Sequence, residues 1–203
     1  MLKINIHFVS LSKNLPIICQ KIFTNFPNFS YEVANITKCK PHNCIVSPAN
    51  SFGQMDGGID AVLSYMLQKD YDSDYIGRKV RKVIADEYYG EQPIGTCILI
   101  PTENEKFPFL AHAPTMTTPE NVVGTLNAYY AFKAVLTSVA NHNKKSKHKI
   151  TSILTTTFCT GCGEMDLETS LKQMLYAYEV VCNPINNTWD AANNHVLKLR
   201  DLK

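Results

Sequence analysis

Patterns typical of strands and of helices alternate along nearly the whole chain, and no other feature restricts the possible folds as strongly. Residues 4–8 and 44–47 have the pattern of buried strands, and 150–158 form a β-branched stretch rich in threonine. Apolar residues recur at helical spacing in the segments between and after them, namely 15–26, 59–67, 76–84, 126–139 and 167–178. This alternation predicts an α/β fold with helices on both faces of a central sheet.

The sheet is expected to be mixed, because residues 96–101 and 107–112 have the pattern of a hairpin-like pair. No linker, repeat or low-complexity stretch divides the 203 residues, so a single domain over 1–203 is predicted. The pattern breaks after Val181, and 183–203 are expected to form a C-terminal tail or short helix. The expected architecture is a three-layer α/β/α sandwich with a central mixed sheet.

Composition and charge exclude several classes of function. Hydrophobic residues make up 45% of the chain and charged residues 19%, which is typical of a folded protein. The net charge of +2 gives no electrostatic basis for a general nucleic-acid or membrane partner. No apolar run approaches membrane-spanning length, and the N-terminal segment alternates like a strand instead of a signal peptide. An intracellular, cytoplasmic protein is therefore predicted.

Two glycine-bearing loops, residues 47–60 and 159–164, each join a predicted strand to a predicted helix. Such a junction offers backbone N–H groups and the positive end of a helix dipole, which suit a phosphate. In open α/β sheets ligands bind outside the carboxyl ends of the strands, so the two loops are expected to share one crevice. Either loop alone is explained as a tight turn, but together they favour a pyrophosphate site.

Three carboxylates in these loops, Asp56, Asp60 and Glu164, would repel a diphosphate. They are better suited to bonding sugar hydroxyls or a water molecule. Asp60 is equally well explained as a first-turn carboxylate that interacts favourably with the helix dipole. Both interpretations of Asp60 stay open at the level of residue chemistry.

The cysteines offer two competing interpretations. Cys159 and Cys162 form a C-x-x-C between a strand and a helix, as a thioredoxin-like redox motif requires, although the motif lies late in the chain. Alternatively, Cys39 and Cys44, with His42 between them, could join Cys159 and Cys162 in a four-sulfur zinc site. A chain with this much core has little need of a structural zinc. We therefore expect no metal.

One histidine stands out by its position. His112 ends an apolar strand directly before Ala113 and Pro114. A histidine there is more often a structural residue than a catalyst. The remaining histidines form no arrangement with a serine or carboxylate that indicates a catalytic triad.

Over nearly its full length the chain resembles the macro domain, the ADP-ribose-binding module. Residues 47–51, Ser-Pro-Ala-Asn-Ser, are similar to the family's Asn-Ala-Ala-Asn-Ser, and 57–60, Gly-Gly-Ile-Asp, to its Gly-Gly-Val-Asp. The interval from Asn50 to Asp60 also fits. Residues 110–114 resemble the family's Ile-His-x-x-x-Pro strand, and 160–163 its second phosphate loop. The form of these motifs looks like a branch found in bacterial and phage proteins.

The resemblance implies roles residue by residue. Asn35 and Ile36 would contact the adenine, with the Asn35 amide as acceptor for adenine N6. Asn50 would hold the distal ribose, and Asp60 matches the catalytic aspartate that positions water for attack on ribose C1. Catalysis would thus involve Asn50 and Asp60. The ligand-binding set implied is Asn35, Ile36, Ala49, Asn50, Phe52, Gly57, Gly58, Ile59, Thr160, Gly161, Cys162, Gly163 and Glu164.

The chain departs from the family pattern at three places. Ser47 replaces the first asparagine, 53–56 replace part of a glycine run, and the second loop is one residue shorter. That loop lacks the aromatic that packs on the distal ribose, and Phe52 is the candidate substitute. The resemblance implies binding of ADP-ribose or an ADP-ribosylated macromolecule without a cofactor. Hydrolysis of mono-ADP-ribose from acidic side chains is the finer hypothesis, and a non-catalytic reader is the alternative.

Overall fold

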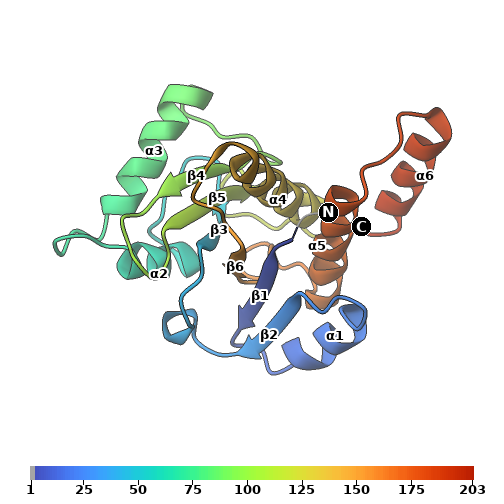
Figure 1. Ribbon diagram of the computed structural model, residues 1–203, viewed down its shortest axis with the longest axis horizontal. Helices are drawn as coiled ribbons and strands as arrows, with labels where there is room; N and C mark the ends of the chain where they lie inside the picture. Colours follow the sequence, from blue (N-terminus) through green and yellow to red (C-terminus); the bar gives the residue numbers. More distant parts are fainter. Residues whose placement is uncertain (1–2) are drawn as a thin grey trace.

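A computed structural model describes residues 3–203, with six strands in one sheet and helices on both of its faces (Figure 1). The strands are β1 (Asn5–Ser10), β2 (Phe29–Val33), β3 (Cys44–Asn50), β4 (Ile98–Pro101), β5 (Phe109–Met116) and β6 (Ser152–Thr155). The helices are α1 (Leu15–Ile22), α2 (Gly58–Met66), α3 (Tyr75–Tyr88), α4 (Asn127–Lys145), α5 (Leu167–Cys182) and α6 (Trp189–Arg200), with a 3-10 turn η1 (Ile36–Lys38). The predicted α/β layering is confirmed.

The strand order is β2-β1-β6-β3-β5-β4. All neighbours pair in parallel except β4 and β5, whose antiparallel register sets Ile98 opposite His112. The expected hairpin-like pair is therefore present, and it makes the sheet mixed. Because β1, β6, β3 and β5 are parallel, their carboxyl ends lie along one edge of the sheet.

The threonine-rich strand is shorter than the sequence predicts, since only Ser152–Thr155 of 150–158 pair in the sheet. At its start, the side chain of Asn43 accepts hydrogen bonds from the backbone N–H groups of Thr151 (3.0 Å) and Ser152 (3.1 Å). At its end, the chain leaves the sheet and residues 156–163 form a loop. The first residues of the β-branched run therefore bond the side chain of Asn43, and the last residues belong to a loop, so neither end extends the strand.

The two helical layers bury two separate apolar cores. On one face α1, α4 and α5 pack on residues such as Phe8, Phe132 and Phe158. On the other face α2 and α3 pack on Ile45, Leu110 and Leu154. Successive residues of a strand point to opposite faces, so one sheet supplies both cores.

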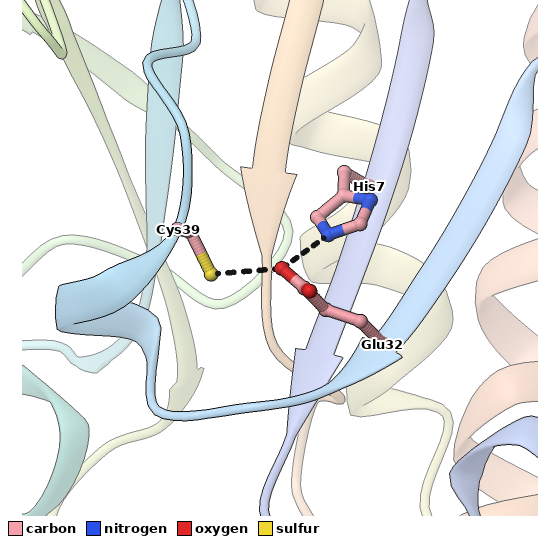
Figure 2. Close-up of side chains that lie close together, drawn as sticks. All are labelled: His7, Glu32 and Cys39. Carbon is pink, nitrogen blue, oxygen red and sulfur yellow. Dashed lines mark hydrogen bonds and ion pairs between the residues drawn. The ribbon is translucent and has the colours of Figure 1, made fainter.

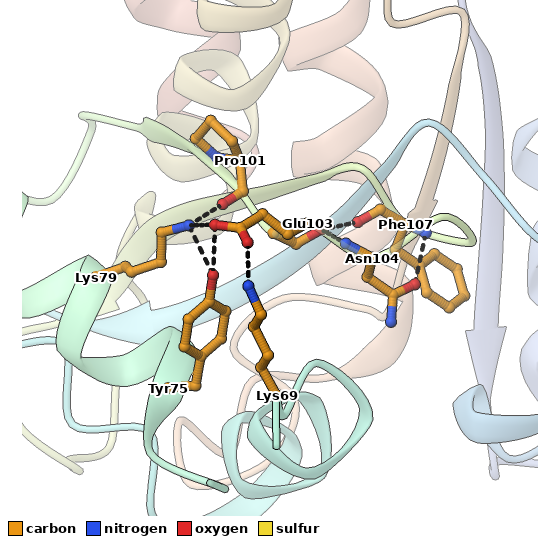
Figure 3. A network of polar contacts seen from close by, with 8 residues as sticks. Lys69, Tyr75, Lys79, Pro101, Glu103, Asn104 and Phe107 are labelled. Carbon is orange, nitrogen blue, oxygen red and sulfur yellow. Dashed lines mark hydrogen bonds and ion pairs between the residues drawn. The ribbon is translucent and has the colours of Figure 1, made fainter. Parts of the chain in front are cut away.

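A polar network fixes α3 to the end of β4 (Figure 3). The Glu103 carboxylate accepts hydrogen bonds from Lys69 Nζ (2.5 Å), Tyr75 Oη (2.7 Å) and Lys79 Nζ (3.1 Å). Lys79 also donates to the backbone oxygen of Pro101 at 2.8 Å. These donors, with Lys69 the strongest, lower the pKa of Glu103 to about 2. The network holds the segment between α2 and α3 in place.

The C-terminal segment is helical, as one of the two sequence alternatives expects. Thr188 caps α6 by accepting a hydrogen bond from the backbone N–H of Ala191. His195 on α6 bonds Tyr176 Oη on α5 at 2.7 Å, and Leu199 is buried. These contacts attach α6 to α5. Within residues 3–203, no helix has the length and apolar character needed to cross a membrane.

Candidate functional site

A cavity of about 610 Å³ opens at the carboxyl ends of the central strands. Its size lies within the usual range of small-molecule sites, about 300–1,000 Å³. The two glycine loops form opposite walls of it, as their positions after β3 and β6 predict. The sequence-predicted residues that line it are Asn35, Ile36, Ala49, Asn50, Gly57, Gly58, Ile59, Asp60, Thr160, Gly161, Cys162 and Gly163.

Phe52 and Glu164 from the same prediction do not line the cavity. The Phe52 side chain is exposed on the loop after β3. Glu164 is exposed, adopts a left-handed backbone (φ 54°), and accepts a hydrogen bond from Asn121 Nδ2 at 2.7 Å. Phe52 therefore does not occupy the position of the aromatic missing from the second loop.

Sequence reasoning missed several lining residues that come from strand ends. Val9 and Ser10 end β1, Thr115 and Met116 end β5, and residues 156–157 follow β6. The sequence held a sign of these residues, because each lies where an apolar strand pattern ends. The sequence alone could not identify them as lining residues, because the strand order decides which strand ends are neighbours.

The first wall is the amino end of α2. The first helical N–H groups, those of Gly58, Ile59 and Asp60, have no intrahelical partner. A Cβ at Gly57 or Gly58 would meet no atom within 4 Å, so the backbone here faces open space. Gly58 has a φ of +53°, which other residues adopt only with strain. Exposed backbone donors and a helix dipole together favour an anion at this position.

The second wall is the loop after β6. Within residues 3–203 the N–H groups of Thr160, Gly161, Cys162 and Gly163 take no hydrogen-bond partner. The loop itself is held by the bond from Met165 N–H to Cys159 O, at 2.9 Å.

Gly163 is required by packing in this loop. A Cβ there would lie 2.5 Å from the oxygen of Cys159 and 2.7 Å from a methyl group of Val122. Gly161, in contrast, has no atom within 4 Å of the position of an added Cβ. The two glycines of this loop therefore serve different purposes, since only Gly163 is demanded by the fold.

Asp60 is a buried carboxyl at the cavity wall, in the first turn of α2. Ser47 Oγ, from β3, donates to its Oδ1 at 2.6 Å. Burial raises the pKa of Asp60 to about 6, while the Ser47 bond lowers it and the charge of Asp56 raises it further. At neutral pH the group is largely ionised yet close enough to its pKa to exchange a proton.

Asn50 organises its own loop. Its Oδ1 accepts from the backbone N–H groups of Phe52 (3.0 Å) and Gln54 (3.3 Å), and its Nδ2 donates to Gln54 O at 2.8 Å. An amide nitrogen carries two hydrogens, so one donor remains available on the cavity side. Asn50 thus combines a loop-forming role with one free donor.

Asn35 caps η1 at the far end of the cavity. Its Oδ1 accepts from both the backbone N–H and the hydroxyl of Thr37, each at 3.0 Å. Both lone pairs of this oxygen are used, so the amide offers N–H donors to the cavity and not the acceptor for adenine N6 that the family resemblance implies. Ile36 beside it is buried and provides an apolar surface.

The structure supports neither the redox interpretation of the cysteines nor the four-sulfur zinc site. All seven cysteines are free thiols. Burial raises the pKa of Cys159 to about 12, the opposite of what a redox nucleophile needs. Among the described residues 3–203, Cys44, Cys159 and Cys162 belong to no cluster of three or more metal-ligating side chains. The alternative of a four-sulfur zinc site therefore finds no support in the described residues.

His112 is a core residue. It is fully buried, and its Nδ1 lies 2.8 Å from the side-chain oxygen of Gln92, which is also buried. Burial lowers the pKa of His112 to about 3, so the ring is neutral at physiological pH. It does not line the cavity and supports the β4–β5 pair instead.

The sequence and the fold both resemble those of known proteins. The model of the Macro-like domain family matches residues 7–192. No curated protein matches the chain. The fold is similar to that of the macrodomain of Mycobacterium tuberculosis DarG, with a TM-score of 0.59, 15% identity, and coverage of 73% of this chain and 88% of that one.

Two structures of the Oceanobacillus iheyensis macrodomain are also similar. One, described as bound to ADP, has a TM-score of 0.58 and 18% identity, covering 84% of this chain and 88% of that one. The other is a mutant with ADPR, with a TM-score of 0.59 and 17% identity, covering 84% of this chain and 90% of that one. At these identities the likeness concerns the fold.

Proposed function

Because the chain belongs to the Macro-like domain family, we propose that it binds ADP-ribose in the cavity between α2 and the loop after β6. The fold neighbours from Oceanobacillus iheyensis are described with ADP and with ADPR, which supports this choice among nucleotides. The ligand would be free ADP-ribose or the group attached to a macromolecule.

The observation that carries the proposal is the pairing of two sets of unpartnered backbone donors across one cavity. The N–H groups at the start of α2 face one side, and those of residues 160–163 face the other. Among residues 3–203, no lysine or arginine lines the cavity. A diphosphate would therefore be held by backbone N–H groups and the dipole of α2.

The remaining side chains of the cavity suggest contacts for the distal ribose and for the adenine. The free Nδ2 hydrogen of Asn50 would bond a hydroxyl of the distal ribose. Ile36 would contact the adenine, and the Asn35 amide would donate to a ring nitrogen because its oxygen is already used by Thr37. This assignment replaces the N6 acceptor role that the resemblance implies.

Titration calorimetry with ADP-ribose, ADP and AMP tests the binding proposal. Binding should weaken in the order ADP-ribose, ADP, AMP, because each step removes groups that the cavity can hold. Gly161→Val places a side chain in open space, so it should keep the fold and lower affinity by about tenfold or more, equal to about 1.4 kcal/mol. Absence of ADP-ribose binding at millimolar concentration would overturn the proposal.

We also propose a second function, hydrolysis of mono-ADP-ribose esters on acidic side chains, which rests on Asp60. Water would attack C1 of the distal ribose, the ester C–O bond would break, and the carboxylate would leave with the bonding electrons. Asp60 would take the proton from the attacking water. A carboxylate leaves readily without a strong general acid, so a positioned base and orientation by the diphosphate site are sufficient.

Release of ADP-ribose from an auto-modified acceptor protein tests hydrolysis. Asp60→Asn should reduce the rate by about a hundredfold or more, in line with removal of a general base, and leave ADP-ribose affinity within a few-fold. Equal rates in the variant would remove Asp60 from the mechanism. Binding without release by the unaltered protein would favour the reader function.

A further inference from the structure

A group of three potential metal ligands lies beside the edge strand β2 and its neighbour β1 (Figure 2), and none of the three lines the cavity. His7 comes from β1, Glu32 from β2, and Cys39 from the residue directly after η1. Their ligand atoms all lie within 4.8 Å of one another. We propose that His7 Nε2, the Glu32 carboxylate and Cys39 Sγ bind a zinc ion, with a fourth position open to water or a further ligand.

The distances suit a small ion with little rearrangement. The His7 Nε2 to Glu32 Oε1 distance is 3.1 Å, and Cys39 Sγ lies 3.4 Å from the same oxygen. Zinc binds nitrogen and oxygen at about 2.0–2.2 Å and sulfur at about 2.3 Å in a tetrahedron, which sets neighbouring ligands roughly 3.5 Å apart. Figure 2 shows the three side chains pointing toward one another from separate segments.

The histidine is already oriented for coordination. His7 Nδ1 lies 2.8 Å from Ser30 Oγ. If this nitrogen donates its hydrogen to the serine, Nε2 carries the lone pair that a metal needs. Metal-binding histidines generally make such a second bond, which fixes both the tautomer and the ring direction. Ser30 would act as a positioning residue of the site.

The combination of nitrogen, oxygen and sulfur ligands favours zinc over magnesium or calcium. One nitrogen, one carboxylate oxygen and one sulfur form a set typical of Zn²⁺, whereas Mg²⁺ and Ca²⁺ prefer oxygen alone. His42, three residues after Cys39, stacks on His7 with ring centroids 5.5 Å apart. Its buried Nδ1 has no hydrogen-bond partner within residues 3–203. His42 thus packs against the ring of His7 and is not one of the three clustered ligands.

Coordination would displace the proton of Cys39. The thiolate, and not the thiol, is the form of cysteine that binds a metal. Binding would break the S–H bond, form an S–Zn bond and release the proton to solvent. Zinc affinity should therefore increase with pH.

Cobalt titration of the full chain tests the site, because Co²⁺ replaces Zn²⁺ and absorbs light when bound to a thiolate. Equimolar Co²⁺ should produce a thiolate-to-cobalt charge-transfer band, which Zn²⁺ should then abolish. Cys39→Ser should lose the band. His7→Gln and Glu32→Gln should lower Zn²⁺ affinity by at least about tenfold, and Ser30→Ala by a similar factor.

Cys182→Ser is the matched control, since Cys182 is a free, partly buried cysteine outside the cluster and the cavity. It should keep the band and the affinity. Circular dichroism of each variant without metal establishes that it is folded. Absence of the band in the unaltered chain, or its persistence in Cys39→Ser, would overturn the proposal. ADP-ribose binding is measured separately and does not enter this test.

Discussion

Replacing Asp60 with asparagine should stabilise the protein while removing the proposed general base. The substitution keeps the shape of the side chain, and the asparagine oxygen can still accept the hydrogen bond from Ser47 Oγ. It removes only the buried charge. The burial that makes the carboxyl a suitable base also makes its ionised form unfavourable in the folded state.

The size of this effect follows from the pKa of Asp60, which burial raises from its usual value of 3.8 to about 6. Below about pH 3 the carboxyl is protonated in both the folded and the unfolded state and contributes no difference in stability. As the pH rises toward 6, the unfolded chain loses this proton while the folded chain keeps it, so folding stability falls. Each pH unit costs about 1.4 kcal/mol, and the full loss is about 3 kcal/mol at neutral pH.

Urea unfolding of the two proteins at several pH values from about 3 to 8 measures this effect. The free energy of unfolding of Asp60→Asn should match that of the unaltered protein near pH 3 and exceed it by up to about 3 kcal/mol at pH 7. Glu105→Gln is the control, because Glu105 is exposed and outside the cavity, and loss of its charge should change the stability by no more than about 0.5 kcal/mol. If the difference in free energy of unfolding between Asp60→Asn and the unaltered protein does not grow with pH, the reasoning is refuted.

Three further changes test separate features. Gly163→Ala should destabilise the protein by about 1–3 kcal/mol in urea unfolding because its Cβ would overlap the loop, whereas Gly161→Ala should stay close to neutral. Ser47→Ala should raise the pKa of Asp60 above about 6, since it removes a hydrogen bond that favours the charged form, and a carbon NMR titration of the carboxyl measures this. Glu103→Gln should lower the Tm near neutral pH; because the pKa of Glu103 falls from 4.5 to about 2, the Tm difference should vanish as the pH drops through that interval.

Local sequence patterns indicated several of the residues that line the cavity. Gly57, Gly58 and Gly161 were expected to expose backbone at strand-to-helix junctions, and the structure places them on the cavity wall. Such glycines can be located from sequence because the change from strand to helix period is visible over a few residues. Phe52 could not be placed in this way, since the direction of an exposed loop side chain depends on contacts outside the loop.

Side-chain hydrogen bonds, even those within a single loop, were the part of the site that sequence reasoning could not supply. The Asn35 oxygen is used by Thr37, and the Asn50 oxygen by its own loop, so both amides offer fewer groups to a ligand than their types suggest. The zinc hypothesis shows the same limit. The sequence alternative grouped Cys39 with other cysteines, whereas the structure places it beside His7 and Glu32. Those two residues are brought together by the pairing of β1 with β2, which the sequence does not reveal.

The sequence by itself determined the alternation of strands and helices, the position of both glycine loops, and the family of the fold. These depend on periodicity and on residue types within short segments. The tertiary structure alone decided the strand order, the bond between Ser47 and Asp60, and the burial that moves the pKa of that carboxyl. The physical reason is that solvation and charge interactions depend on which distant segments pack together, and a local pattern does not contain that information.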